Sequence, residues 1–307
     1  MNAAHISKQH LVSQVLLRQF TMLGPKGSGR QLLPFDVWNP ERQQKLKGPR
    51  ACGAAMDFVA FDSASAENLW GSVETRVPAA LAAVQAGTPF ADPLHVEVLR
   101  DLVVLHYVRS HRYRSVYTSA FKTVRVNVRS ELLSRYPEHV RREALRQTGL
   151  HLPGSGSLGS FAERLIEQSE VTQDFGSGKL FRSSIENVFN KVRAMAAKWH
   201  LELLTPQGGQ FLIGDNPALT VRTDTRPFSY NMAFGDAHSI ILPIGPRHLL
   251  ALGPENLLGS IPRSVVDETN TVQILAADRY VYMHPRSGLE TFTRAKARQR
   301  QADRMVR

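Results

Sequence analysis

The sequence predicts an α+β fold with a small N-terminal β element, a central helical region and a C-terminal β-rich part with a returning helix. Apolar residues recur at helical spacing across residues 62–199, whereas residues 200–290 hold short apolar runs bounded by Gly, Pro and Asp. With 307 residues, 42% of them hydrophobic, the chain is long enough for a sizeable core. We therefore expect one composite domain over residues 1–290 and a basic C-terminal tail over residues 291–307.

The composition excludes several classes of protein. Cys52 is the only cysteine, which argues against a disulfide scaffold and a Cys-based zinc site and favours the cytoplasm. We expect no membrane span, because no uncharged apolar run reaches about 18 residues. Residues 1–10 lack the apolar core of a secretory signal. Gly-rich segments 154–159 and 176–179 lack the context of nucleotide-binding loops, so we expect no organic cofactor.

Taken in order, the first elements are a helix and a hairpin. Apolar positions near helical spacing predict a helix over His10–Phe20. Short strands are expected over Arg30–Val37 and Asp57–Phe61, as one hairpin with Asn39-Pro40 at its bend.

The central helices follow from periodicity and from the residues that break it. A helix is expected from Ala66 towards Gly87, and another from Pro93 through an apolar, central segment into the basic region. Pro137 breaks this pattern. A short helix to Leu150, a Gly/Ser linker over 152–160 and helices over 161–169 and 183–199 complete the region.

The C-terminal part contains mainly strands. Strands are expected over residues 201–205, 211–214, 219–222, 240–244, 249–252 and 280–283, with the returning helix over 265–277.

The positive charge is concentrated in two segments of a chain whose formal net charge is +11. Residues 109–146 hold ten Arg or Lys against three acids, and residues 294–307 hold six against one. Clustered cations attract polyanions, and each Lys or Arg at a phosphate releases counterions. The expected nucleic-acid contacts are Arg109, Arg112, Arg114, Lys122, Arg125, Arg129, Arg294 and Arg298. An acidic protein, a membrane surface or a merely solvated helix face are the alternatives.

Acidic residues supply a candidate metal site. Glu67 and Glu74 are seven residues apart on an expected helix and so share a face. Asp215 follows an apolar strand, at a position where side chains are presented to sites. Together they are candidate ligands for Mg²⁺ or Mn²⁺. The alternatives are a helix-start role for Glu67, an ion pair of Glu74 with Arg109, and an Asx turn at Asp215.

Two further residues complete the candidate catalytic set of His10, Glu67, Glu74, Asp215 and Asn216. His10, at an expected helix start, could transfer a proton near neutral pH. Asn216 could steady a ligand or substrate. His10 could instead be a partly buried residue at the helix start.

These residues carry a resemblance to a known family. The segment from His10 to Phe20, the Glu67/Glu74 pair, Arg109 or Arg112, and the segments 214–217, 243–246 and 277–282 resemble, in order, the motifs of the bacterial domain of unknown function 4238 family. Leu11 and Ser13 depart from its opening motif. The resemblance implies that His10, Glu67, Glu74, Asp215 and Asn216 belong together, and it implies no established activity.

The preferred hypothesis is a metal-dependent nuclease or phosphodiesterase acting on DNA or RNA. The alternatives are a nucleic-acid-binding protein without catalysis and a basic interaction module that docks on an acidic protein. The oligomeric state is not predicted.

Overall fold

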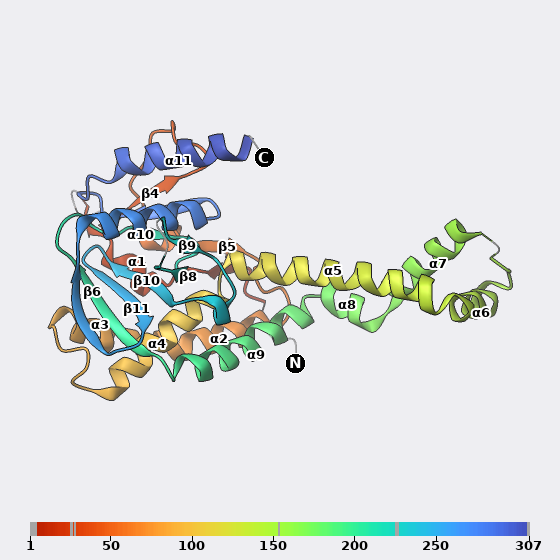
Figure 1. Cartoon of the computed structure of the whole chain (residues 1–307). Coiled ribbons are helices and arrows are strands. Elements are labelled where there is room, and N and C mark those ends of the chain that lie inside the picture. Colours follow the sequence, from red (N-terminus) through yellow and green to blue (C-terminus); the bar gives the residue numbers. More distant parts are fainter. Residues whose placement is uncertain (1–4, 25–26, 28, 153, 225–226, 306–307) are drawn as a thin grey trace.

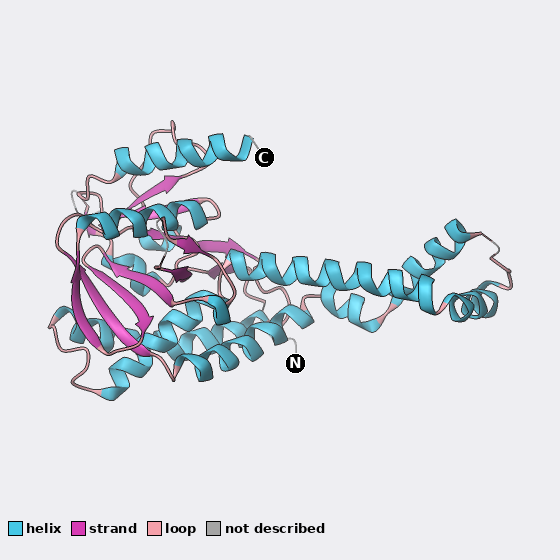
Figure 2. Ribbon diagram, in the orientation of Figure 1, coloured by secondary structure: helices cyan, strands magenta, loops and turns pink. Residues whose placement is uncertain are grey.

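A long helical arm projects from an α+β body, which confirms the predicted fold class (Figure 1). The structure is a computed structural model that describes residues 5–24, 27, 29–152, 154–224 and 227–305. Figure 2 shows strands in the body and only helices in the arm.

The element bounds are as follows. The helices are α1 (Gln14–Gln19), α2 (Ser63–Glu74), α3 (Val77–Gln85), α4 (Pro93–Val108), α5 (His111–Arg135), α6 (Pro137–Thr148), α7 (Ser155–Gln168), α8 (Glu170–Gly176), α9 (Lys179–Ala196), α10 (Arg263–Ala276) and α11 (Glu290–Met305), with short 3₁₀ turns at Pro49–Ala51 and Phe234–Asp236. The strands are β1 (Lys8–His10), β2 (Met22–Leu23), β3 (Arg30–Gln31), β4 (Leu33–Asp36), β5 (Ala54–Met56), β6 (His200–Pro206), β7 (Ile213–Gly214), β8 (Leu219–Arg222), β9 (Ser229–Tyr230), β10 (Ser239–Gly245), β11 (His248–Gly253), β12 (Leu257–Ile261) and β13 (Tyr280–Met283).

The largest sheet has six strands in the order β12-β6-β11-β10-β8-β9. Its neighbours pair antiparallel except β12, which runs parallel to β6. A second sheet has the order β4-β13-β7, so it joins an N-terminal strand to two strands from the C-terminal half. The N-terminal β element and the β-rich part therefore share a sheet.

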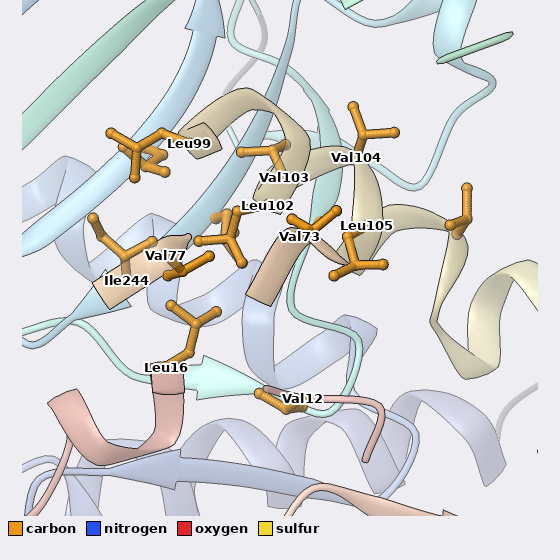
Figure 3. Packing of buried hydrophobic residues seen from close by; sticks show 14 of the residues in the cluster. Val12, Leu16, Val73, Val77, Leu99, Leu102, Val103, Val104, Leu105 and Ile244 are labelled. Carbon is orange, nitrogen blue, oxygen red and sulfur yellow. The ribbon is translucent and has the colours of Figure 1, made fainter. Parts of the chain in front are cut away.

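Helix α4 lies at the centre of the body, as its apolar sequence predicts. Leu99, Leu102 and Val103 are fully buried and share a cluster with one face of the six-stranded sheet. Figure 3 shows this helix against Val12, Leu16 and residues of α2 and α3. The other face of the sheet packs against α10. Burial on nearly all sides of α4 explains why its apolar residues form no single stripe.

The arm consists of α5, α6, α7 and α8, and none of the 25 residues of α5 is buried. The α5 residue Phe121 stacks on Phe175 of α8, with ring centroids 3.7 Å apart. A small separate core at the tip joins α6 to α7 through residues such as Val140 and Phe161. The arm thus holds together through its own contacts, away from the main core.

The N-terminal predictions were only partly right. The expected helix over 10–20 is shortened to α1, because residues up to His10 extend as β1 and pair with β5. The expected strand over 57–61 is wrong, since Asp57 adopts a left-handed conformation. The expected hairpin is also wrong, because β4 pairs with β13 from the far end of the chain.

Breaks subdivide the expected long helices. The helix from 66 to 87 is two helices, because Pro78 starts α3 anew. The helix that enters the basic region breaks at Ser110, whose hydroxyl accepts a hydrogen bond from the N–H of Tyr113 and so caps α5. The expected linker is mostly the start of α7. Residues 170–176 form α8, which was not predicted.

In the C-terminal half, strands β9 and β12 were not predicted. The basic segment expected as a tail forms α11 and packs on α10. Arg300 is buried and donates to the carbonyls of Ile274 and Ala277 at the end of α10. A cation at this end is favourable for the helix dipole.

Candidate functional site

Helix α2, the end of helix α4 and strand β1 bring a polar cluster together beside α1. Helix α2 presents Glu67 and Glu74, Arg109 caps the end of α4, and His10 is the last residue of β1. The pKa of Glu67 and the pKa of His10 both respond to the charges of Glu74 and Arg109. Three of the five predicted catalytic residues therefore share one electrostatic environment.

An ion pair between Arg109 and Glu74 anchors the cluster. Nη2 of Arg109 lies 2.6 Å from Oε1 of Glu74, and the Arg109 side chain is only 2% exposed. Arg109 also donates to the Leu11 carbonyl and the Ser13 hydroxyl, and it lies over the ring of Trp70 at 4.9 Å. This is the ion-pair alternative considered for Glu74, and it removes Arg109 from contact with a nucleic-acid backbone.

The environment shifts the pKa values of the two carboxyls in opposite directions. Burial favours the neutral form of Glu74, but Arg109 and the Ser13 hydroxyl outweigh burial and lower the pKa of Glu74. Burial raises the pKa of Glu67; the charge of Arg109 opposes this rise, and the charge of Glu74 adds to it. Two carboxyls with divergent pKa values are a pattern typical of acid–base sites.

Glu67 also has an unused acceptor. Its Oε1 is buried and has no hydrogen-bond partner among the described residues. The same is true of Nε1 of Trp70, one helical turn further along α2 in a fully buried side chain. Buried polar atoms normally have partners, so this turn of α2 has one acceptor and one donor available to a water or a ligand. Glu67 lies beyond the first turn of α2, so the helix-start role considered for it is wrong.

His10 is positioned to carry or release a proton. Its Nε2 lies 3.4 Å from the Arg50 carbonyl and 3.3 Å from Nε2 of Gln14. When Nε2 is protonated it can donate to the carbonyl, and when it is not it can accept from the Gln14 amide. Burial lowers the pKa of His10, the contact with the Arg50 carbonyl opposes this change, and the charges of Lys8 and Arg109 add to the lowering, so the neutral ring predominates at pH 7.

His106 fixes the position of Ser13 beside the polar cluster. Its Nδ1 lies 2.8 Å from the Leu102 carbonyl, and its Nε2 lies 3.1 Å from the backbone N of Ser13. These partners require a neutral ring with the proton on Nδ1. Burial lowers the pKa of His106 to about 3, and the charge of Arg109 lowers it too. Ser13 is thereby oriented to donate its hydroxyl to Glu74.

One cationic side chain, that of Lys8, lies beside His10. Nζ of Lys8 donates to the Arg50 carbonyl, the same carbonyl that His10 contacts. Both Lys8 and Arg50 are exposed. An anionic substrate that approaches His10 would therefore meet positive charge.

The predicted metal site is not formed. No three His, Cys, Asp or Glu side chains in the described part of the chain group so that they could hold a metal ion. Asp215 instead accepts three backbone N–H bonds, from Asp278, Arg279 and Tyr280, at 2.6–2.7 Å. These bonds orient the start of β13. The role is structural, but it reaches a distant strand, whereas the Asx turn considered for Asp215 would involve only its own neighbours.

Asn216 also has a structural role. Its Oδ1 accepts from the backbone N–H of Arg112 at 3.1 Å, and its Nδ2 donates to the Ala276 carbonyl at 2.8 Å. It is 4% exposed. The residue therefore ties the first turn of α5, at the base of the arm, to the end of α10, and is not available to steady a substrate.

The residues expected to contact nucleic acid differ in their partners within the protein. Arg125 and Arg129 pair with Glu163 of α7, and Arg298 pairs with Glu41. Arg294 donates to the Pro40 carbonyl and pairs with Glu290. Arg112 and Arg114 donate to the carbonyls of Asn231 and Asp57, and Lys122 is exposed. Exposed ion pairs are weak, so the exposed side chains remain available to a polyanion, whereas Arg125 and Arg294 are partly buried; the exposed ones are Arg112, Arg114, Lys122, Arg129 and Arg298.

Sequence reasoning missed five members of this site: Lys8, Ser13, Arg50, Trp70 and His106. Ser13 was treated only as a departure from a family motif, yet its hydroxyl joins Glu74 to Arg109. No role in the site was predicted from the sequence for His106. Its buried position on an apolar helix was the available signal of a hydrogen-bonded structural role.

Comparison with known proteins places the chain in a family. A model of the family described as "Protein of unknown function (DUF4238)" matches residues 8–287, which is most of the chain. Comparisons with curated proteins and with solved structures find no match. No helix in the described segments is both long and apolar enough to cross a membrane. The match spans the His10 cluster and the Asp215-Asn216 segment together, and the chain therefore belongs to the DUF4238 family.

Proposed function

We propose that this protein is a nucleic-acid-directed hydrolase that cleaves phosphodiester bonds by acid–base chemistry at His10 and Glu67. The observation that carries the proposal is that these two residues share a cluster in which the pKa of the acid is raised and the pKa of the base is lowered. The proposal does not use Asp215, whose carboxylate is occupied by backbone N–H groups.

Each group has a defined task in the reaction. Neutral His10 takes a proton from a water molecule as the water oxygen attacks phosphorus. The bond from phosphorus to the leaving sugar oxygen breaks, and Glu67 gives its proton to that oxygen. A proton from solvent or from His10 then restores Glu67. Glu74 stays ionised beside Arg109, and its negative charge helps Glu67 to keep a proton.

Cations around the site support an anionic substrate. Lys8 lies beside His10, where a phosphate would bind, and its charge acts on the His10 ring. Arg112, Arg114 and Lys122 are exposed along α5, which leads away from the body (Figure 1). A long polyanion could therefore contact the arm and the site together, with an affinity that falls as salt rises.

The test uses pure protein with 5′-fluorescent single-stranded RNA, single-stranded DNA and duplex DNA. Each is incubated with EDTA, Mg²⁺ or Mn²⁺ between pH 4.5 and pH 8. We expect cleavage that persists in EDTA and is fastest between the pKa of His10 and the pKa of Glu67, on the acid side of neutral. His10→Ala and Glu67→Gln should each slow cleavage about 100-fold or more. His139→Ala, on the exposed arm, is the matched control.

The proposal fails if no substrate is cleaved, or if His10→Ala and Glu67→Gln cleave as fast as the unchanged protein. Salt-dependent binding without cleavage would support the non-catalytic nucleic-acid-binding alternative. Cleavage that requires Mg²⁺ or Mn²⁺ would contradict the acid–base scheme.

A further inference from the structure

A largely apolar cavity lies at the base of the arm, away from the polar cluster. Its volume is about 460 Å³. Its walls come from α5, α9, β8 and the segment 231–234, which are far apart in the sequence. Volumes of 300–1,000 Å³ are typical of small-molecule sites.

The wall has the composition of a site for an apolar body. Aromatic and aliphatic side chains form most of it, contributed by residues such as Tyr113, Val192, Met195 and Phe234. Phe234 is held in place by Trp199, whose ring stacks on it with centroids 5.1 Å apart. The wall is thus built on packed side chains, which favours a preformed site.

Among the residues that the structure describes, the charged lining groups are Arg112 and Lys191, and no Asp or Glu lines the cavity. Neither cation forms an ion pair with another residue in the described ranges. The guanidinium of Arg112 donates to the Asn231 carbonyl at 3.3 Å, and both residues line the cavity. Polar lining atoms of Ser110, Thr220 and Asn231 add hydrogen-bonding groups.

From this arrangement we propose that the cavity binds a small amphipathic carboxylate, with a medium-length hydrocarbon chain among the apolar side chains and its carboxylate between Arg112 and Lys191. Two unopposed cations select an anion over a cation or a neutral alcohol. The largely apolar wall selects a hydrocarbon body over a free phosphate. This site is independent of the proposed hydrolase chemistry.

Binding of the ligand would also affect the arm. Tyr113 and Val116 on α5 contribute to one wall, while Val188 and Lys191 on α9 contribute to another. A ligand between them bridges the arm to the body. Occupancy should therefore protect the first turns of α5 from hydrogen exchange, because a ligand that binds only the folded state stabilises it.

The test titrates the whole protein with decanoate, decan-1-ol and decyltrimethylammonium. The readouts are calorimetry and the fluorescence of Trp199, which stacks on a lining residue. Decanoate should bind saturably at one site, and about tenfold or more tighter than the alcohol and the ammonium ion. Lys191→Glu should weaken decanoate binding about tenfold. Lys198→Glu, an exposed lysine just beyond the end of α9 and outside the lining, is the matched control and should not weaken it.

A second variant tests the position of the site without removing a charge. Val116 is 47% exposed and lines the cavity, so Val116→Trp should fill the space without disturbing the core. Circular dichroism checks that both variants are folded. The proposal is overturned if decanoate does not bind, if the ammonium ion binds as tightly, or if folded Lys191→Glu and Val116→Trp bind decanoate unchanged.

Discussion

Replacing Glu74 by Gln tests the electrostatic basis of the candidate site. Gln keeps an oxygen that can accept from Arg109 and Ser13, so the shape of the contact survives while the negative charge is lost. The Arg109 guanidinium, 2% exposed, would then be a buried cation without a counter-charge. Breaking a buried pair in this way typically costs about 3–5 kcal/mol.

The expected cost of breaking this ion pair is smaller, because the pair is only partly buried. The Glu74 side chain is 27% exposed, so water partly solvates the gap. The retained hydrogen bond contributes about 1 kcal/mol. We therefore expect Glu74→Gln to lower the free energy of unfolding by about 2–3 kcal/mol at pH 7. That corresponds to a fall in Tm of about 3–5 °C for a chain of this size.

The pH dependence provides an independent check. The pKa of Glu74 is lowered in the folded state. Its stabilising contribution is therefore complete above the unfolded value of 4.5 and is lost as pH falls through the lower folded pKa. Urea unfolding at pH 7 and pH 3 should show the difference between Glu74→Gln and the unchanged protein shrinking in acid.

The matched control is Glu143→Gln, which removes an exposed ion pair with Arg146 on the arm. It should leave the unfolding midpoint unchanged. The reasoning is refuted if Glu74→Gln unfolds at the same urea concentration as the unchanged protein, or if its deficit is equally large at pH 3 and pH 7.

Three further substitutions test the structure around the site. Gly53→Ala should lower the free energy of unfolding by about 3 kcal/mol, because Gly53 has φ +65° and a Cβ there would lie 2.9 Å from Cβ of Val12. Urea unfolding measures the change, and equal stability of the two proteins would contradict this reasoning. In the unchanged protein, His106 should lower the free energy of unfolding by about 1.4 kcal/mol for each pH unit as pH falls from 6.5 to about 3. His106→Gln should remove this part of the pH dependence. The unfolded chain binds a proton in that window and the folded chain does not, so an unchanged slope would refute the assignment. Asn216→Ala should cost about 1–3 kcal/mol and speed hydrogen exchange at the first turn of α5, and unchanged exchange there would count against the proposed tie.

The sequence correctly indicated the fold class and the central position of α4. Both depend on local pattern: the uninterrupted apolar segment around Leu102 requires burial on many sides, and short apolar runs bounded by Gly and Pro favour strands. The pairing of strands was not predictable in this way. Strand β4 pairs with β13 across some 240 residues, and no local property of either strand encodes its partner.

The predicted catalytic set was separated by the fold into two groups. His10, Glu67 and Glu74 share one electrostatic environment, whereas Asp215 and Asn216 are bonded to the backbone of other elements. The local sequence Asp215-Asn216-Pro217 is the same whether the Asp215 carboxylate binds a metal or accepts three backbone N–H groups. The number of backbone donors around it depends on residues 278–280, more than 60 positions away.

Residue types and their spacing determined which segments become helices and strands, where charge accumulates, and that two glutamates share one helical face. The opposite pKa shifts of those glutamates, the contact of Asn216 with the first turn of α5 and the formation of an apolar cavity at the base of the arm arose only once the chain was folded. Burial and the proximity of distant charges are properties of three-dimensional packing, and they control whether a carboxyl keeps its proton or gives it up.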